Sequence, residues 1–242
     1  MNAGKIRGVL FDKDDTLLDL AAFWLAPVEH TAAFILHELG RENDDTLRHE
    51  LECAAGFDGT ALIPESPVVA GTNADVIRAS MNVLASHGIK TEDDALFARL
   101  AETYLELACL RHGVCQPCGD LATVLDGLHS AGILTGVATS DSFASTVHAL
   151  EKMGVAGHFN CILTADRVAR PKPAPDMAEI FCARCQLLPE EVAMVGDSAN
   201  DMRFARNAGI TAIYFNRSGQ SRNVDADIII HRLEDLLPLL SH

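Results

Sequence analysis

Residues 6–16, IRGVLFDKDDT, decide the fold. Six largely apolar residues, Ile6 to Phe11, end abruptly in a cluster of acidic side chains. A short apolar run that stops at polar residues is typical of a buried strand. The carboxylates that follow would stand at the carboxyl end of that strand, which is where open parallel sheets bind their ligands. The opening of the chain therefore predicts a buried strand and, directly after it, a candidate site.

The second half of the chain alternates between strand-like and helix-like segments. The expected strands are residues 133–138, 161–163, 192–195, 211–215 and 227–230. The expected helices are one that Asp120 caps and Gly132 ends, followed by residues 142–153, 174–185, 200–208 and 233–240. Alternation of this kind indicates βαβ units and a mostly parallel sheet. The predicted fold class is α/β, with a Rossmann-like core built from residues 1–17 and 114–242.

Residues 18–113 have a different pattern, because apolar side chains recur there at helical spacing and no convincing strand alternation appears. Examples are Val76, Ile77, Met81 and Leu84 and, further on, Leu96, Leu100, Tyr104, Leu107 and Leu110. We expect Pro27 to interrupt or restart the first helix. The turn-rich residues 54–71 are expected to form a loop. An all-α domain is thus predicted as an insertion after the first strand.

Composition and charge exclude several classes of partner. The 242 residues are 48% hydrophobic and 22% charged, as in an ordinary globular protein. A net charge of −15 repels nucleic acid and anionic lipid, so neither is an expected partner. No uninterrupted apolar run approaches the roughly 18 residues of a membrane span. Acidic residues come too early for a signal peptide, and seven scattered cysteines fit free thiols in the cytoplasm. The oligomeric state is left open.

Polar residues also follow three of the later strands. These residues are Thr139, Ser140, Asp141, Lys172, Asp197 and Asp201. The carboxyl ends of parallel strands meet at one edge of a sheet, so the set is expected to gather with the acidic cluster of residues 12–15. Carboxylate oxygens suit Mg²⁺, and a lysine with hydroxyl groups suits a phosphate. The sequence therefore predicts a magnesium site beside a phosphate clamp.

These segments resemble the four motifs of the haloacid dehalogenase superfamily, in the order of that family. Residues 12–17, DKDDTL, resemble its Asp-x-Asp-Gly-Thr motif, and Thr139 ends the second motif. Lys172 begins KPAPD, the third, and residues 196–201 match the fourth, Gly-Asp-x-x-x-Asp. The helical insertion is similar to the cap domain of the phosphoglycolate-phosphatase-like and β-phosphoglucomutase-like branch. Four motifs in order, each at a strand end, argue strongly against a chance match.

The resemblance implies a role for each acidic residue of the first and fourth motifs. Asp12 would attack phosphorus and form an aspartyl phosphate. Asp14 would protonate the leaving oxygen and then accept a proton from the hydrolytic water. Asp12, the backbone carbonyl of Asp14, and Asp197 would hold Mg²⁺. The family thus implies a magnesium cofactor and a covalent intermediate.

The resemblance also implies which groups bind the phosphate. Lys172 would screen the charge on the transferring oxygens, and Thr139 and the backbone amide of Ser140 would donate hydrogen bonds to them. Asp201 would orient either Lys172 or a metal-bound water. Two cap residues with polar tips, Thr72 and Asn73, are candidates for contacts with the remainder of the substrate.

Two positions depart from the usual pattern of the first motif. Asp15 stands where the family usually has glycine, and aspartate tolerates the left-handed backbone region better than most residues. Its extra charge close to the metal leaves its effect on activity open. Lys13 replaces a more usual apolar residue. We expect Lys13 to point toward the cap domain and meet substrate, or otherwise to be an exposed surface lysine.

The resulting functional hypothesis is a Mg²⁺-dependent phosphatase that acts on a small phosphorylated metabolite, with phosphoglycolate as the nearest substrate class. Three alternatives remain. They are a phosphomutase of the β-phosphoglucomutase type, a binding protein that keeps the fold and has lost turnover, and a phosphorylation switch of the receiver type. Receiver domains are about half as long and have no inserted cap. Halide removal is disfavoured because the family's dehalogenases lack the second aspartate of motif one, and Asp14 is present.

Overall fold

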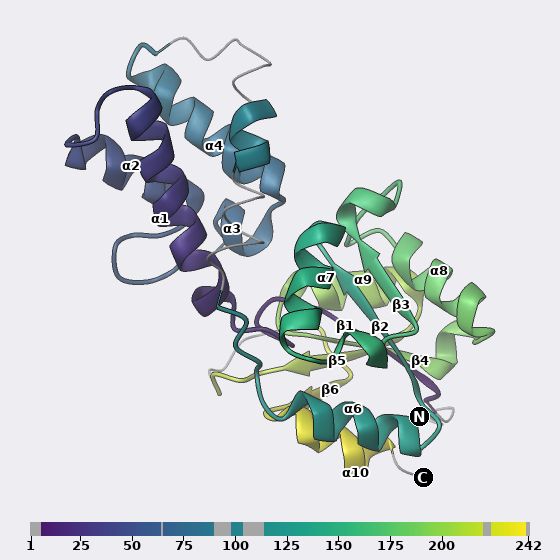
Figure 1. Cartoon of the computed structure of the whole chain (residues 1–242). Coiled ribbons are helices and arrows are strands. Elements are labelled where there is room, and N and C mark those ends of the chain that lie inside the picture. The colour runs from purple at the N-terminus through teal and green to yellow at the C-terminus, as the bar shows by residue number, and fades with distance from the viewer. Residues whose placement is uncertain (1–5, 64, 90–97, 104–113, 220–223, 241–242) are drawn as a thin grey trace. The chain divides into compact units, whose positions relative to one another are not determined.

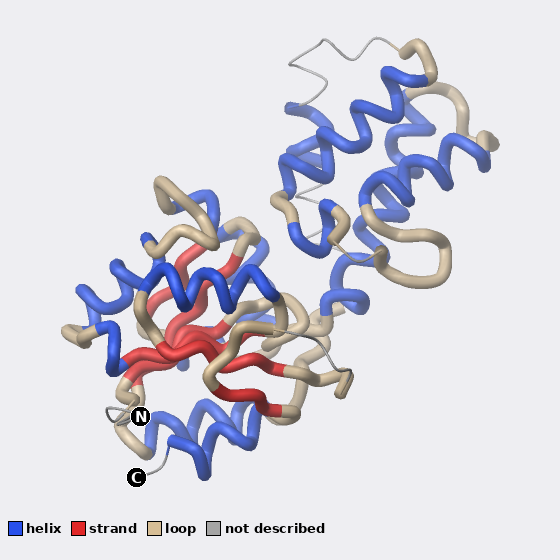
Figure 2. The backbone as a smooth tube through the Cα atoms, turned by 180° about the vertical axis from the view of Figure 1, so that it is seen from behind, coloured by secondary structure: helices blue, strands red, loops and turns tan. Residues whose placement is uncertain are grey.

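A six-stranded parallel sheet organises one of the two units into which the chain divides (Figures 1 and 2). The structure is a computed structural model that describes residues 6–63, 65–89, 98–103, 114–219 and 224–240. The α/β unit comprises Met1–Asp19 and Gln116–His242, and the helical unit comprises Leu20–Cys115. The chain therefore leaves the α/β unit soon after the first strand of that unit. It returns before the first helix of the α/β unit begins.

All neighbouring strands of the sheet run parallel, in the order β3-β2-β1-β4-β5-β6. The strands are β1 Gly8–Phe11, β2 Leu134–Thr139, β3 Cys161–Thr164, β4 Val192–Gly196, β5 Thr211–Phe215 and β6 Ile228–Ile230. Strand β1 lies between β2 and β4, and all four of its residues are buried. Helices cover both of its faces, which explains why this strand is a continuous apolar run. The α/β class predicted from the sequence is confirmed.

Helices pack on both faces of this sheet (Figure 2). They are α6 Leu121–Ser130, α7 Phe143–Lys152, α8 Asp176–Cys185, α9 Ala199–Ala208 and α10 Leu236–Leu240. The apolar residues of α6, α7 and α10 join one core cluster, and those of α8 and α9 join the other. Phe11 belongs to the first cluster and its neighbour Leu10 to the second, as the alternation of side chains along a strand requires.

Local signals in the sequence set several helix boundaries. Asp120 caps α6 and Ser142 caps α7, each by accepting a backbone N–H of the first turn. Gly209 ends α9 with a left-handed φ of 68°. The expected last helix is divided, because residues 233–235 form a 3₁₀ turn before α10 begins. The carboxylate of Asp235 accepts two backbone N–H groups ahead of that turn and tightens it.

The helical unit contains α1 Leu20–Glu38, α2 Asp45–Ala55, α3 Pro67–Ala70 and α4 Asn73–Ser86, and residues 98–103 are also helical. Buried side chains of α1, α2 and α4 form its interior. The turn-rich residues 54–71, expected to be a loop, include the short helix α3. Leu96, Tyr104, Leu107 and Leu110, which the expected pattern includes, lie outside the described residues.

Helix α1 continues through Pro27, so the prediction that this proline interrupts the helix is wrong. Proline removes one backbone donor and strains the preceding turn. Apolar side chains on both sides of it, including Trp24 and Val28, are buried. Burial along the whole helix offsets the local cost of the proline.

Helix α1 is also long and apolar enough, by length and composition alone, to cross a membrane. Half of its most apolar window is buried inside the structure. The core helix of a globular protein satisfies the same criteria, so this single helix is weak evidence for a membrane span.

Candidate active site

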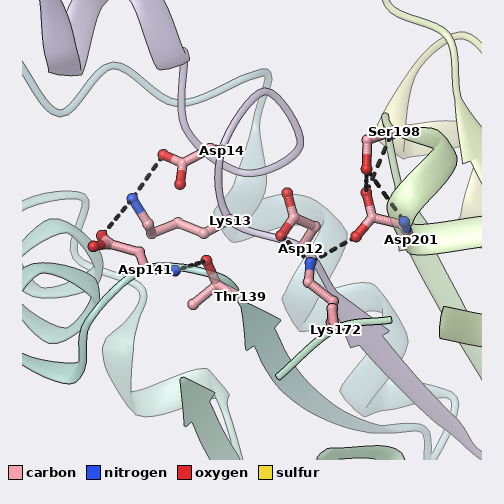
Figure 3. A network of polar contacts seen from close by, with 8 residues as sticks. All are labelled: Asp12, Lys13, Asp14, Thr139, Asp141, Lys172, Ser198 and Asp201. Atoms are coloured by element: carbon pink, nitrogen blue, oxygen red, sulfur yellow. Dashed lines mark hydrogen bonds and ion pairs between the residues drawn. The ribbon is translucent and has the colours of Figure 1, made fainter. Parts of the chain in front are cut away.

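Three strand ends place the residues of the candidate site next to one another (Figure 3). Asp12 follows β1, Thr139 ends β2 and Asp197 follows β4. The backbone N–H of Asp12 donates to the carbonyl of Val195 at 2.9 Å, which ties the end of β1 to the end of β4. Strands β2 and β3 lie on one side of β1 in the sheet, and β4, β5 and β6 lie on the other. The strand order therefore reverses at β1, and Asp12 stands at this point.

The loop before α8 adds a buried lysine to these strand ends. Nζ of Lys172 donates to Oδ1 of Asp12 and to Oδ1 of Asp201, both at 2.6 Å. Burial alone would lower the pKa of this ammonium, but the two carboxylates outweigh burial and raise it above its ordinary value. The lysine is therefore a permanent positive charge in contact with Asp12.

Asp201 is held in place by the first turn of α9. Its Oδ2 accepts the backbone N–H of Ser198 at 3.1 Å and the hydroxyl at 2.5 Å. The N–H of Asp201 donates back to the Ser198 hydroxyl, which completes a capping box. A Cβ on Gly196 would lie 2.4 Å from Cγ of Asp201, so only glycine leaves room for this carboxylate. Of the two partners expected for Asp201, the structure places Lys172 in contact with it.

Three carboxylates form a group that could hold a metal ion. Ligand oxygens of Asp12, Asp197 and Asp201 all lie within 4.8 Å of one another. Burial raises the pKa of Asp12 to about 7, with the Lys172 ammonium opposing the rise and neighbouring carboxylates adding to it. Burial and the charges of Asp201 and Asp12 raise the pKa of Asp197 well above its usual range. An all-oxygen donor set with more negative than positive charge fits a hard divalent cation such as Mg²⁺.

Thr139 ends β2 and Ser140 follows it, and β2 is a neighbour of β1, the strand that leads to Asp12. The Thr139 hydroxyl is buried and accepts the backbone N–H of Asp141 at 3.1 Å. Within the described part of the chain its own proton meets no acceptor. That hydroxyl can therefore donate to a ligand oxygen without losing the hydrogen bond it already makes.

Lys13 lies in the interior, so the expectation that it points toward substrate or solvent is wrong (Figure 3). Its side chain has no exposed surface, and Nζ lies 2.7 Å from Oδ1 of Asp14 and 3.0 Å from Oδ2 of Asp141. Burial opposes the charge of the ammonium, but the two carboxylates raise its pKa above the ordinary value. Two nearby negative charges explain why a lysine can replace an apolar residue in this loop.

Asp15 adopts a left-handed φ of 54°, which confirms that aspartate can occupy this glycine-like position. Its carboxylate lies 3.2 Å from one nitrogen of Arg217, in the loop after β5. Another nitrogen of Arg217 lies 3.0 Å from Asp19, the last residue before the chain enters the helical unit. The extra charge of Asp15 therefore has a cation beside it.

The two candidates in the helical unit occupy the start of α4. Thr72 is the N-cap of that helix, and its hydroxyl donates to Oδ2 of Asp75 at 2.7 Å. Asp75 in turn accepts the backbone N–H of Thr72 at 2.9 Å and completes a capping box. Thr72 thus stabilises α4 by capping its N-terminus. Asn73 is the first residue of the helix and does not take part in this capping box.

Comparison with known proteins decides the family. The family model of the haloacid dehalogenase-like hydrolases matches residues 6–209. The chain belongs to the haloacid dehalogenase-like hydrolases. The matched range includes all four loops that form the candidate site and the whole helical unit.

Relatives within the hydrolase family are similar over almost their whole length. Phosphoglycolate phosphatase of Salmonella typhimurium is 27% identical, with 97% of this chain and 92% of that protein covered. A solved structure of a predicted phosphoglycolate phosphatase from Haemophilus somnus matches with a TM-score of 0.69 at 17% identity, covering 98% of each chain. A phosphatase of this superfamily from Thermococcus onnurineus matches with a TM-score of 0.67 at 24% identity, covering 97% of this chain and 98% of the other. The structural matches establish the fold that this hydrolase shares with them.

Three residues of the hydrolase site were not assigned a role from the sequence. They are Asp141, Ser198 and Arg217. Asp141 is among the polar residues expected at the strand ends, and Ser198 follows β4 directly after Asp197. Arg217 also follows a strand, β5, but the sequence gives no sign that Asp15 and Asp19 need a cation.

Proposed function

We propose that this hydrolase is a Mg²⁺-dependent phosphatase of the cytoplasm that cleaves a small phosphorylated metabolite resembling phosphoglycolate. The observation that carries the proposal is the contact of Asp12 with Lys172 inside a group of three carboxylates. This arrangement puts a carboxylate nucleophile, a fixed cation and oxygen ligands for a metal in one place. Similarity to phosphoglycolate phosphatases over 97% of the chain supports the substrate class.

In this proposal the reaction has two steps. A carboxylate oxygen of Asp12 attacks phosphorus, the bond from phosphorus to the ester oxygen breaks, and the proton of Asp14 goes to the departing oxygen. Water then attacks the aspartyl phosphate, Asp14 takes the proton of that water, and inorganic phosphate leaves Asp12 unmodified. Asp14 thus ends the cycle protonated and ready for the next ester.

The chain's own residues would hold the metal and the phosphate. Asp12, Asp197 and the backbone carbonyl of Asp14 would hold Mg²⁺. The cation supplies the positive charge that lets an anionic phosphate approach an anionic nucleophile. Lys172, fixed by Asp201, would neutralise the transferring oxygens, and the Thr139 hydroxyl and the Ser140 amide would donate to them.

The helical unit would act as a cap domain that selects the substrate. The groups around Asp12 recognise a phosphoryl group and a metal, which all phosphomonoesters share. Discrimination between esters therefore needs residues elsewhere in the chain. Asn73 at the start of α4 is the remaining polar candidate in the helical unit, because helix capping already explains Thr72.

Assay of the purified protein tests the proposal. Phosphate release from a panel of phosphorylated metabolites that includes 2-phosphoglycolate should require Mg²⁺ and stop in chelator. Asp12→Asn should abolish turnover, because an amide is not a nucleophile for phosphorus. Asp126→Asn, a carboxylate of the same unit that pairs with His158, is the matched control and should keep the wild-type rate. Full activity in chelator, or turnover by Asp12→Asn, would refute the mechanism.

A further inference from the structure

Lys13 is a buried charge that the proposed reaction does not use (Figure 3). Its side chain is wholly inaccessible, whereas that of Asp14 is 20% exposed and that of Asp141 is 3% exposed. Burial of an ammonium costs free energy unless nearby negative charges compensate for its positive charge. The compensation here comes from Asp14, the residue proposed to transfer protons, and from Asp141, which has no assigned role.

The Lys13 ammonium connects two motifs of the site. Lys13 and Asp14 belong to the loop after β1, and Asp141 belongs to the loop after β2. The backbone N–H of Asp141 donates to the Thr139 hydroxyl, so the connection reaches the proposed phosphate-binding residues. Figure 3 shows Asp14 turned toward Lys13, while the Asp12 carboxylate is turned toward Lys172.

Asp12 and Asp14 of the first motif therefore each have a lysine of their own. Nζ of Lys172 already contacts Asp12 and Asp201, both at 2.6 Å. Lys13 provides a separate cation for Asp14 at 2.7 Å. Asp12 and Asp14 thus pair with different lysines, although only one residue separates them in the sequence.

We propose that Lys13 is the positioning residue of Asp14, and that Asp141 is the anchor that fixes Lys13. The inference rests on the proposed function, in which Asp14 gives a proton to the leaving oxygen. Proton transfer needs the donor at a defined place, and the hydrogen bond that the buried ammonium donates to Oδ1 of Asp14 fixes this side chain whether it is protonated or ionised. Lys13 acts through Asp14, because a side chain without exposed surface cannot touch the substrate.

The test uses two esters that differ in their need for an acid. The alkoxide of 2-phosphoglycolate needs a proton to leave, whereas p-nitrophenolate leaves without one. The value of kcat/KM on each ester reports the phosphoryl-transfer step. The variant is Lys13→Met with Asp141→Asn, which removes the buried cation and the anchor together and leaves no uncompensated charge at the anchor.

We expect kcat/KM for 2-phosphoglycolate to fall by about tenfold to hundredfold in this double variant, and kcat/KM for p-nitrophenyl phosphate to fall by less than about threefold. Adding both changes to Asp14→Asn should cause no further loss, because Lys13 and Asp141 act through Asp14. The matched control is Arg7→Met with Glu191→Gln, an ion pair at the opposite end of β1, and it should change neither ester.

Equal losses on both esters, or an additional loss in the Asp14→Asn background, would overturn the positioning role.

Circular dichroism checks that the double variant is folded. If the double variant is unfolded, the single variant Asp141→Asn replaces it, because this change keeps the contact between Lys13 and Asp14. We expect this variant to lower the ratio of kcat/KM for 2-phosphoglycolate to kcat/KM for p-nitrophenyl phosphate by about threefold to tenfold. An unchanged ratio in that folded variant also overturns the inference. Absence of activity in the wild type, or a wild-type rate in Asp14→Asn, instead refutes the proposed function, and the inference falls with it.

Discussion

Nζ of Lys172 lies 2.6 Å from Oδ1 of Asp12, although 159 residues of chain separate them. The side chains are 3% and 10% exposed, so water screens this pair little. The same nitrogen is fixed from the other side by Asp201. The position of the positive charge beside the proposed nucleophile therefore depends on a residue that need not touch the substrate.

Asp201→Asn should weaken that support. An amide keeps the shape of the side chain but attracts the ammonium less, so Lys172 loses its second fixed partner. We expect kcat/KM to fall by about tenfold to hundredfold, as loss of an outer partner at such sites commonly causes. The measurement is steady-state phosphate release at saturating Mg²⁺. Asp227→Asn, which weakens an ion pair with Arg206, is the control, and a wild-type rate in Asp201→Asn would contradict the prediction.

The buried carboxylates predict how Mg²⁺ stabilisation depends on pH. Burial raises the pKa of Asp12 from 3.8 to about 7, so between these values the metal-free folded protein binds more protons than the unfolded chain. The contribution of Asp12 to stability should therefore fall as the pH rises from about 4 to about 7. Mg²⁺ favours the ionised carboxylate, so it should raise the melting temperature more at about pH 8 than at about pH 5. Thermal unfolding with Mg²⁺ or chelator measures this, and equal shifts at both pH values would count against it.

Because Asp15 and Arg217 form an ion pair, we expect the effect of replacing Arg217 on kcat/KM to depend on whether Asp15 is charged. Arg217→Ala leaves the Asp15 charge uncompensated near the anionic substrate and should lower kcat/KM about threefold to tenfold. Asp15→Asn removes that charge, and asparagine tolerates the left-handed φ of 54°. Arg217→Ala should therefore cost less in the Asp15→Asn background. Kinetics of both single variants and of the double variant decide this, and independent effects would show that the pair is not coupled.

Substitutions of Thr72 and Asn73 should have different effects, because we expect Thr72 to affect stability and Asn73 to affect substrate specificity. Thr72→Ala removes the N-cap of α4 and should lower the free energy of unfolding by about 1 kcal/mol. Asn73→Ala should leave stability unchanged and alter the ratio of rates on the best metabolite and on p-nitrophenyl phosphate. Chemical denaturation and the two assays measure these effects. If Asn73→Ala changes neither rate, the start of α4 has no part in substrate selection.

Much of the sheet and of the candidate site could be predicted because the signals are local. The strand 211–215 was predicted at its observed bounds, and the polar residues after β1, β2 and β4 could be assigned to one edge of the sheet. Lys172 was also expected to gather with Asp12 at this edge, but their direct contact was not predicted. These predictions needed only periodicity, strand ends and the order of the motifs.

Features that depend on distant partners could not be predicted. The sequence around Lys13 gives no sign that Asp141 lies within 3.0 Å of its ammonium, so the lysine was expected to face substrate or solvent. Pro27 is a helix breaker by its local chemistry, yet burial of the flanking apolar residues keeps α1 continuous. In both cases packing between remote segments overrides the local preference.

The place of β1 between β2 and β4 has a consequence for synthesis on the ribosome. The strand that carries Asp12 is made first, but both of its neighbours are made only after the helical unit. We expect the helical unit to fold before the sheet, and β1 to lack one of its two partner strands until β4 emerges. A nascent chain arrested before β4 should therefore be cut by protease within residues 6–19, and one arrested after β5 should be protected there. In this protein, residues of the sheet that are synthesised early are among the last to reach their final environment.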